Sequence, residues 1–466
     1  MVNRLLCVLS GAAAVAACAT YHPAPLAPVE IARVYQNRSL EAVAVSAEVK
    51  RIAPAAEWNV EAWDRLSLFA AALHSSPSIG EARAHAASAE AAVRAARAGP
   101  AMTLTLTAEY AGKAPESSPW LYGVTNDIPL DLGARRSSRI NAAQFAAVAA
   151  RYDYAEAVWT ARMAIRRALA ERFLTMREVS IAEELAQVRA RQLMALERRV
   201  VGGEAVRSEL ERVRAEAAGD NRRLADAQAR LIAASLSLAE VIGVPLSALD
   251  RANLTWDGFD APASPQDRDV MALRETALLS RADILRSVAA YDQAESELRG
   301  EIARQWPEVH VGPGYTWERG LVKLPFSVGL ALPSFDLNRG AIGAVEARRA
   351  EAGIHLEAVI ARAQAAIDGA LVERAAARDA LARVRDVDLQ TAKRVADQAD
   401  QELASGAIDR VDWSATQAGL RLAELAEVDA LRRLHAADAA LEDALRRPLE
   451  GPELQIAPPQ AKGDQR

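Results

Sequence analysis

The sequence contains few cysteines, few aromatic residues and no clusters of basic residues. Only two cysteines occur, Cys7 and Cys18, so Cys18 has no disulfide partner in the chain that follows it. Aromatic residues make up 5% of the 466 residues, although 51% are hydrophobic. This composition favours long helices or coiled coils over a bulky globular core. The net charge of −6, with both signs interspersed, gives no indication of nucleic-acid binding.

Long uncharged apolar runs are also missing. No such run of about eighteen residues follows Cys18, which excludes transmembrane helices. A chain of this kind that crosses a membrane would have to do so as strands. Residues 1–17 combine Arg4 with a short apolar run, which predicts a signal peptide.

The end of this run, Val15-Ala16-Ala17-Cys18, resembles the lipobox of bacterial lipoproteins. We therefore expect Cys18 to become the lipidated first residue of the mature protein. The alternative is an ordinary signal peptide that is cut near Ala17 and leaves a free cysteine. Ala19 after the cysteine favours sorting to the outer membrane. Residues 18–56 contain several prolines and are predicted to form an extended arm that follows the lipid.

Proline and glycine are absent from Ala134 to Val200, where apolar residues recur every three or four positions. This pattern predicts one very long amphipathic helix. A second long helix is predicted at 342–404, although its three glycines make its continuity less well supported. Shorter helices are predicted at 206–242 and 408–447, after glycine breaks.

Alternation of apolar and polar residues predicts four strands. The segments TLTLTAEY (103–110), WLYGVTNDI (120–128), EVHVGPGYTW (308–317) and LPFSVGLAL (324–332) all have this period of two. Each strand pair passes into a long helix through a similar join, IPLDLGARR in the first case and LPSFDLNRG in the second. The residues that define these joins are Asp131, Gly133, Asp336, Asn338 and Arg339.

The same order of helix, two strands, join, long helix, glycine break and helix therefore occurs twice. We predict a first repeat at 57–244, a linker at 245–268 and a second repeat at 269–447. Residues 448–466 are polar and contain proline, so they are predicted to be a disordered tail.

Four strands cannot close a membrane barrel, because the smallest such barrels have about eight strands. Open strand edges are not tolerated in lipid, so several chains must share one barrel, and three chains would supply about twelve strands. The predicted fold class is mainly α with a β-barrel contribution. It combines long antiparallel coiled-coil helices with four transmembrane strands per chain, and the helices of the trimer continue the wall of the shared barrel.

On these features the chain resembles the TolC-like outer-membrane efflux proteins over nearly the whole mature sequence. The resemblance implies a homotrimer in the outer membrane of a Gram-negative bacterium, with a twelve-stranded barrel, an α-helical periplasmic tunnel and most of the chain in the periplasm. It also implies a periplasmic adaptor (membrane fusion) protein and an inner-membrane pump as partners. The segments WPEVHVGPGYTWERG and LPSFDLNRGAIGAVEARRA are most similar to the branch that serves heavy-metal pumps of the resistance-nodulation-division type. Drugs or organic solutes remain alternative substrates.

The glycine breaks are the predicted periplasmic end of the duct. Gly202, Gly203 and Gly406 are expected to form the turns that face the adaptor. By the resemblance, Glu209 and Asp412 line the constricted end as a periplasmic gate. Alternatively, both acids only occupy the first turn of a helix, where the helix dipole favours a carboxylate. Arg207 and Arg410 occur at matching places and either pair with these acids or face solvent.

Catalytic and cofactor motifs are absent from the sequence. It has no nucleotide-binding loop, no G-x-S-x-G and no metalloprotease motif, so we expect no enzyme activity and no cofactor. The six histidines are scattered and predict no metal site. The alternative to a duct is a lipid-anchored periplasmic coiled-coil scaffold, which would leave the four strands unexplained.

Overall fold

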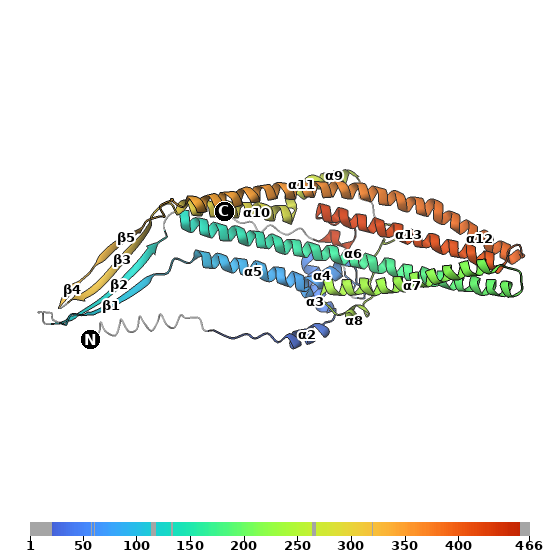
Figure 1. Ribbon diagram of the computed structural model, residues 1–466, viewed down its shortest axis with the longest axis horizontal. Helices are drawn as coiled ribbons and strands as arrows, with labels where there is room; N and C mark the ends of the chain where they lie inside the picture. The colour runs from blue at the N-terminus through green and yellow to red at the C-terminus, as the bar shows by residue number, and fades with distance from the viewer. Residues whose placement is uncertain are drawn as a thin grey trace.

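The protein is an elongated, mainly α-helical molecule with a small antiparallel sheet at one end (Figure 1). The computed structural model describes residues 21–56, 58–59, 61–112, 118–131, 134–262, 267–318 and 320–456. Two residues singled out from the sequence, Cys18 and Gly133, lie outside these described residues.

The first long helix, α6 (Ala134–Val201), confirms the predicted uninterrupted helix and extends over 68 residues. Its backbone hydrogen bonds continue without a break because no proline or glycine interrupts them. Two shorter helices, α5 (Pro77–Arg97) and α7 (Arg207–Ile242), pack along α6 one after the other. They meet at Gly243, which has a φ of 87°. A Cβ atom there would lie 2.3 Å from the carbonyl oxygen of Ser75, so only glycine fits this joint.

The second half of the chain repeats this arrangement. Its long rod consists of α11 (Arg339–Arg383), a π-helical turn at Val384–Leu389 and α12 (Gln390–Ser405). The four glycines of the rod do not interrupt it, and the only change from α geometry in it is the π-helical turn. Helices α10 (Ala282–Ala303) and α13 (Arg410–Leu445) pack against both this rod and α6.

The predicted strands form one sheet with the order β1-β2-β3-β4, and β5 also pairs with β3. Their bounds are β1 Thr103–Tyr110, β2 Trp120–Leu130, β3 Glu308–Glu318, β4 Leu321–Lys323 and β5 Phe326–Ala331. The fourth strand predicted at 324–332 corresponds to β5, and β4 is an additional short strand that precedes Pro325. Proline has no backbone N–H to donate, although its carbonyl oxygen accepts from Gly314 N at 2.8 Å.

The two faces of the sheet differ in polarity. Cross-strand partners point to the same face, and Val124 pairs with both Leu106 and Tyr315. The adjacent residue, Thr125, pairs with Thr105 and Gly314 on the opposite face. Leu106 is 72% exposed, so the apolar face has no cover within one chain.

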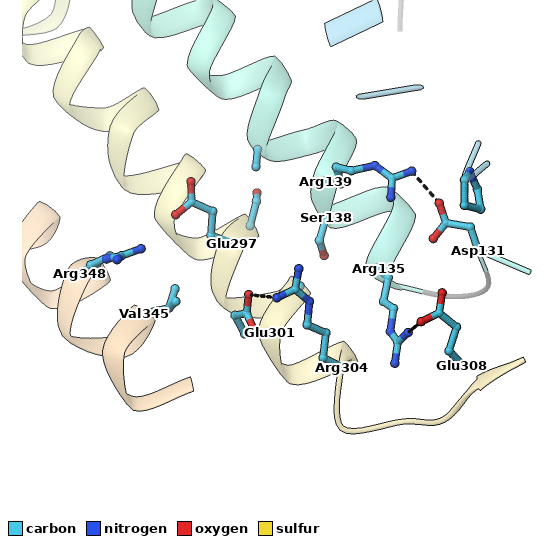
Figure 2. A pocket seen from close by; sticks show the side chains of 14 residues that line it. Asp131, Arg135, Ser138, Arg139, Glu297, Glu301, Arg304, Glu308, Val345 and Arg348 are labelled. Carbon is cyan, nitrogen blue, oxygen red and sulfur yellow. Dashed lines mark hydrogen bonds and ion pairs between the residues drawn. The ribbon is translucent and has the colours of Figure 1, made fainter. Parts of the chain in front are cut away.

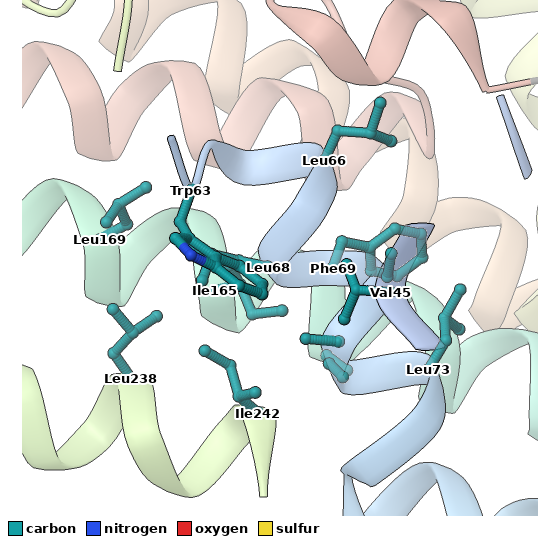
Figure 3. Packing of buried hydrophobic residues seen from close by; sticks show 14 of the residues in the cluster. Val45, Trp63, Leu66, Leu68, Phe69, Leu73, Ile165, Leu169, Leu238 and Ile242 are labelled. Atoms are coloured by element: carbon teal, nitrogen blue, oxygen red, sulfur yellow. The ribbon is translucent and has the colours of Figure 1, made fainter. Parts of the chain in front are cut away.

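A hydrophobic core lies in the middle of the molecule, where α4 (Arg65–Ser75) packs between α6 and α7 (Figure 3). Nine consecutive residues of α4 are buried, because the helix is surrounded on all sides. Its N-cap, Asp64, accepts a hydrogen bond from Ser67 N at 2.8 Å. The core includes Trp63, Leu68, Phe69, Ile165, Leu169, Leu238 and Ile242.

The N-terminal arm is not extended as predicted. It contains α2 (Pro28–Gln36), whose residues are all exposed, and α3 (Ala42–Ile52), which packs against α4 in the middle of the molecule. Arg38, between them, donates to the carbonyl oxygens of Ser75 and Gly243 at 3.1 Å each, and so holds the joint between α5 and α7. The prolines suggested an extended segment, but Pro28 occupies the first turn of a helix, where proline is tolerated.

Two further predictions are corrected by the structure. The tail is not disordered over 448–456, because a 3₁₀ turn at Pro452–Gln455 packs into the molecule and its Glu453 is buried. The helix that opens the second predicted repeat, before β3, is divided at Arg281 into α9 (Asp267–Ser280) and α10. Within the linker, α8 (Leu246–Leu249) forms a short helix.

Among the described residues, no helix combines the length and the apolar composition needed to cross a membrane.

Candidate functional site

Two helical hairpins end together at the opposite end of the molecule from the sheet (Figure 1). The turn from α6 to α7 contains Gly202 and Gly203, and the turn from α12 to α13 contains Gly406. Gly203 and Gly406 both have a φ of 74°, a conformation that favours glycine. No atom lies within 4 Å of a Cβ atom placed at either residue, so backbone conformation and not crowding explains these glycines.

One acidic residue joins the two hairpin ends. Asp409 is the N-cap of α13, and its Oδ1 accepts from the backbone N–H groups of Val411 at 2.7 Å and Asp412 at 3.0 Å. Its other oxygen forms an ion pair with Arg199 of α6. A small apolar cluster that contains Val411 together with Leu196, Leu210 and Val213 supports this contact.

The predicted gate acids lie close to these turns. Glu209 and Asp412 both occupy the first turn of their helices, as the simpler alternative required. Asp412 is exposed and Glu209 is partly buried. Arg207 and Arg410 are exposed, and among the described residues neither forms an ion pair with a gate acid. The four side chains are therefore available to a partner or to the solution at the tip.

The first strand-to-helix join is held by arginines of the first turns of α6. Arg139 forms an ion pair with Asp131 at 2.6 Å and also donates to the carbonyl oxygens of Ala96 and Ala98. Arg135 pairs with Glu308 at 3.2 Å, which ties the start of α6 to β3 (Figure 2). A cavity of about 590 Å³ lies beside these pairs, between α6, α10 and α11.

The second join turns through two left-handed residues, Leu337 and Asn338, with φ values of 53° and 61°. The Asn338 side chain donates to the backbone oxygen and a carboxylate oxygen of Glu301, at 2.9 Å each. Asp336 accepts from Ser334 Oγ and from Asn338 N, and these hydrogen bonds lower the pKa of Asp336. Arg339 is exposed at the start of α11. Both joins are thus fixed by hydrogen bonds to α10 or α6.

The structure also contains a buried ionic cluster that the sequence did not predict. Glu442 of α13 accepts from Arg162 Nη2 at 2.9 Å and from Arg166 Nε at 3.1 Å. The segment that follows α13 supplies two more carboxylates. The full cluster consists of Arg65, Arg162, Arg166, Glu442, Glu450 and Glu453, three cations and three anions that are almost completely buried.

This ionic cluster joins the two halves of the chain. Arg65 and Arg166 come from the first half, whereas all three glutamates come from the end of the second half. Gly451 lies directly under Arg65, because a Cβ atom there would be 1.6 Å from Arg65 Nη2. Burial raises the pKa of Glu453, opposed by the nearby Arg65 guanidinium. The cluster is therefore a structural connection between the two halves.

Among the described residues, no group of three or more His, Cys, Asp and Glu side chains is placed to hold a metal ion.

Comparisons with known proteins agree with this architecture. The sequence model of the family described as "Outer membrane efflux protein" matches residues 68–244 and 273–445. The cobalt-zinc-cadmium resistance protein CzcC of Cupriavidus metallidurans is 26% identical over 216 residues, which are 46% of this chain and 50% of CzcC. The chain thus matches about half the length of this curated relative.

Solved structures extend the similarity to most of the chain. The outer membrane protein VceC of Vibrio cholerae has a TM-score of 0.66 at 19% identity, covering 83% of this chain and 97% of VceC. The open state of the MtrE outer membrane channel of Neisseria gonorrhoeae has a TM-score of 0.66 at 18% identity, covering 82% of this chain and 89% of MtrE. At these identities, the similarity shows a common fold.

Proposed function

Because the chain belongs to the outer membrane efflux protein family, whose members are efflux channels and not enzymes, we propose that it is the exit duct of a tripartite efflux pump. One observation carries this proposal. A sheet with an uncovered apolar face is joined to two long helical hairpins that end together at the far end of the molecule. A coiled-coil scaffold would need the hairpins but not the sheet.

The sheet supports a barrel shared by three chains. Strand β1 lies at one edge, and β4 and β5 lie at the other, with no further strand among the described residues to pair with them. In lipid, unpaired backbone groups cost several kcal/mol each, so both edges need partners. Aromatic rings cluster at the β1–β2 hairpin end, where Trp120 and Tyr122 stack at 5.7 Å. Trp306, at the opposite end of the sheet, is 73% exposed. Aromatic residues at both ends are typical of membrane barrels.

The helical tip is the proposed contact for the adaptor protein. Gly202, Gly203 and Gly406 form its exposed turns, and the Arg199–Asp409 pair keeps the two turns together. Through the adaptor, the duct would receive substrate from an inner-membrane pump of the resistance-nodulation-division type. The proposed substrate class is heavy-metal cations, supported by the partial match to CzcC. Drugs and organic solutes are the alternative.

Cys18 remains the proposed lipidation site, because it follows the signal-like segment in the sequence. The change Cys18→Ser should abolish palmitate incorporation while leaving a mature chain that folds. Palmitate labelling of the wild type and the variant in cells would test this. Unchanged labelling of the variant would show that Cys18 is not the modified residue.

The barrel is tested by a matched pair of arginine substitutions in β1. Leu106→Arg places a charge on the apolar face and should cost about 2–4 kcal/mol near the bilayer midplane, which would reduce trimer yield. Thr105→Arg places the same charge on the polar face and should be tolerated. The measurements are trimer content on SDS gels without heating and channel conductance in planar bilayers.

Equal effects of the two arginines, or a wild-type protein that forms neither trimers nor channels, would contradict the duct and favour a scaffold. The substrate class needs its own experiment. Deleting the gene should lower the cells' resistance to zinc, cobalt or cadmium, and the wild-type gene should restore it. Unchanged metal resistance with increased drug sensitivity would favour the alternative substrates.

A further inference from the structure

A histidine and a carboxylate lie together on the polar face of the sheet. His310 of β3 has its Nδ1 atom 3.2 Å and 3.1 Å from the two carboxylate oxygens of Asp127 in β2. His310 pairs across the sheet with Pro129 on one side and Gly329 on the other. Neither neighbour has a polar side chain, so Asp127 alone determines how the imidazole is held.

The contact with Asp127 fixes which nitrogen of His310 is free. An ionised carboxylate can only accept hydrogen bonds, so Nδ1 of the imidazole must carry the proton. In the neutral ring, Nε2 then holds the lone pair, and it has no hydrogen-bond partner among the described residues. Metal-binding histidines commonly have this arrangement, in which a carboxylate holds one ring nitrogen and makes the other a better ligand.

The surface around His310 leaves this nitrogen accessible. Three glycines lie on the same face of the sheet as His310, so no side chain rises beside the imidazole at these positions. They are Gly312, Gly314 and Gly329. The side chain of His310 is 28% exposed, and that of Asp127 is 53% exposed. The remaining acid near the base of β3, Glu308, is already paired with Arg135.

We propose that His310, oriented by Asp127, is a coordination point for divalent transition-metal cations on the polar face of the sheet, with Nε2 as the ligand atom. The inference rests on the proposed function, because this face lines the pore only if the strands form a barrel with their apolar side toward lipid. One nitrogen ligand per chain makes the site weak, which suits a passing substrate. Imidazole selects zinc, cobalt and similar ions over calcium and magnesium.

The competing explanation is a cross-strand pair that only stabilises the sheet. A pair with only this structural role would not bind metal ions, so the test must measure the effect of a metal ion on the pore. The full-length trimer is reconstituted in planar bilayers, and Zn²⁺ is added while single-channel conductance is recorded. We expect Zn²⁺ to reduce the conductance of the wild type at concentrations at which Ca²⁺ has no effect.

Two substitutions separate the roles of the pair. His310→Gln should raise the half-blocking Zn²⁺ concentration about tenfold or more, and Asp127→Asn should raise it by up to about tenfold, because loss of a supporting carboxylate weakens metal binding. His355→Gln, at an exposed histidine of α11, is the matched control and should leave the block unchanged. At higher concentrations Ca²⁺ is expected to block at the acidic tip, and this block should be the same in all variants.

The possible outcomes distinguish this site from the duct itself. If the channels conduct normally and His310→Gln leaves the Zn²⁺ block unchanged, the site is wrong and the duct stands. If Zn²⁺ and Ca²⁺ block the wild type equally, the block does not come from an imidazole and the site is again wrong. If the wild-type protein forms no channel, the duct is wrong and the site falls with it.

Discussion

The buried ionic cluster connects the two halves of the molecule, and Glu442 pairs with two of its three arginines. Its carboxylate is completely buried and pairs with both Arg162 and Arg166. Glu442→Ala would remove the one carboxylate that both buried guanidinium groups share. Loss of one member of a buried ion pair typically costs about 3–5 kcal/mol. We therefore expect a marked fall in the thermal unfolding midpoint, measured by circular dichroism.

The matched control is Glu373→Ala. Glu373 also pairs with an arginine, Arg433, at 2.7 Å, but both side chains are about half exposed. Water screens and replaces such a pair, so we expect little measurable change in the midpoint. Equal shifts for the two variants would mean that the buried ionic cluster does not stabilise the connection between the halves.

A second residue, His435, should make stability depend on pH. It stacks on Phe259 at 4.4 Å, and its Nε2 lies 2.9 Å from the Phe259 carbonyl oxygen. Burial lowers the pKa of His435 from 6.5 to about 4. The folded state therefore binds fewer protons than the unfolded state between these two values, and stability falls as the pH is lowered through this window. The loss from this residue should reach at most about 3 kcal/mol.

His435→Gln keeps a donor for the Phe259 carbonyl but cannot titrate in this range. The variant should lose less stability than the wild type between pH 6.5 and pH 4, as measured by chemical denaturation at each pH. The comparison is needed because burial raises the pKa of Asp438 and of Glu453, and these groups act in the opposite direction. Identical pH profiles would show that His435 is solvated in the folded state.

The sequence predicted some of these residues and could not predict others. Glu209 and Asp412 could be proposed from the sequence because their positions relative to the glycine breaks repeat along the chain. Arg162 and Arg166 are spaced four residues apart on the buried face of α6, which marks them as unusual. Their partner, Glu442, follows about 280 residues later, and periodicity within one helix carries no information on such a distant contact.

At the scale of whole elements, local patterns were reliable where the chain is regular. The unbroken helix α6 and the strand β1 followed directly from the absence of proline and glycine and from alternation. Errors occurred where contacts between distant segments decide the conformation. In the N-terminal arm α3 packs against α4, and the ordered segment after α13 packs against the same helix. Prolines in these segments suggested extended or disordered chain instead.

The joint between α5 and α7 gives a prediction at this scale. Gly243→Ala would force a side chain into a left-handed conformation and against the Ser75 carbonyl oxygen. The backbone strain alone costs about 1–3 kcal/mol, and the clash adds to it. Gly219→Ala, in the interior of α7 with no atom within 4 Å, is the control. It should stabilise the protein by roughly 0.5–1 kcal/mol, because alanine favours a helix. The measurement is the thermal unfolding midpoint of both variants. Midpoints that shift in the same direction would contradict this explanation of Gly243.

For the molecule as a whole, the two repeats at 57–244 and 269–447 remain our proposed division of the chain. Each repeat contributes half of the sheet and one hairpin of the tip, so sheet and tip are built at opposite ends by the same pattern of elements. The ionic cluster lies between them, where the second repeat contacts the first. A trimer would then multiply both ends by three without any new element.

The tip of such a trimer gives the final prediction. Glu209 and Asp412 would contribute up to six carboxylates to one narrow ring, since neither acid is neutralised by Arg207 or Arg410 among the described residues. A ring of this kind attracts cations and repels anions, and salt weakens the effect. We expect the channel to be cation-selective and open to block by multivalent cations, as measured by reversal potentials in planar bilayers.

Single substitutions at the ring should reduce this selectivity in part, and Glu209→Ala combined with Asp412→Ala should remove most of it. Trimer yield should barely change, because a carboxylate in the first turn of a helix contributes only about 0.3–1 kcal/mol. Glu90→Ala combined with Asp368→Ala removes two carboxylates far from the tip and should leave the selectivity intact. If the Glu209 and Asp412 double variant keeps the wild-type preference and block, the two acids only stabilise the starts of α7 and α13.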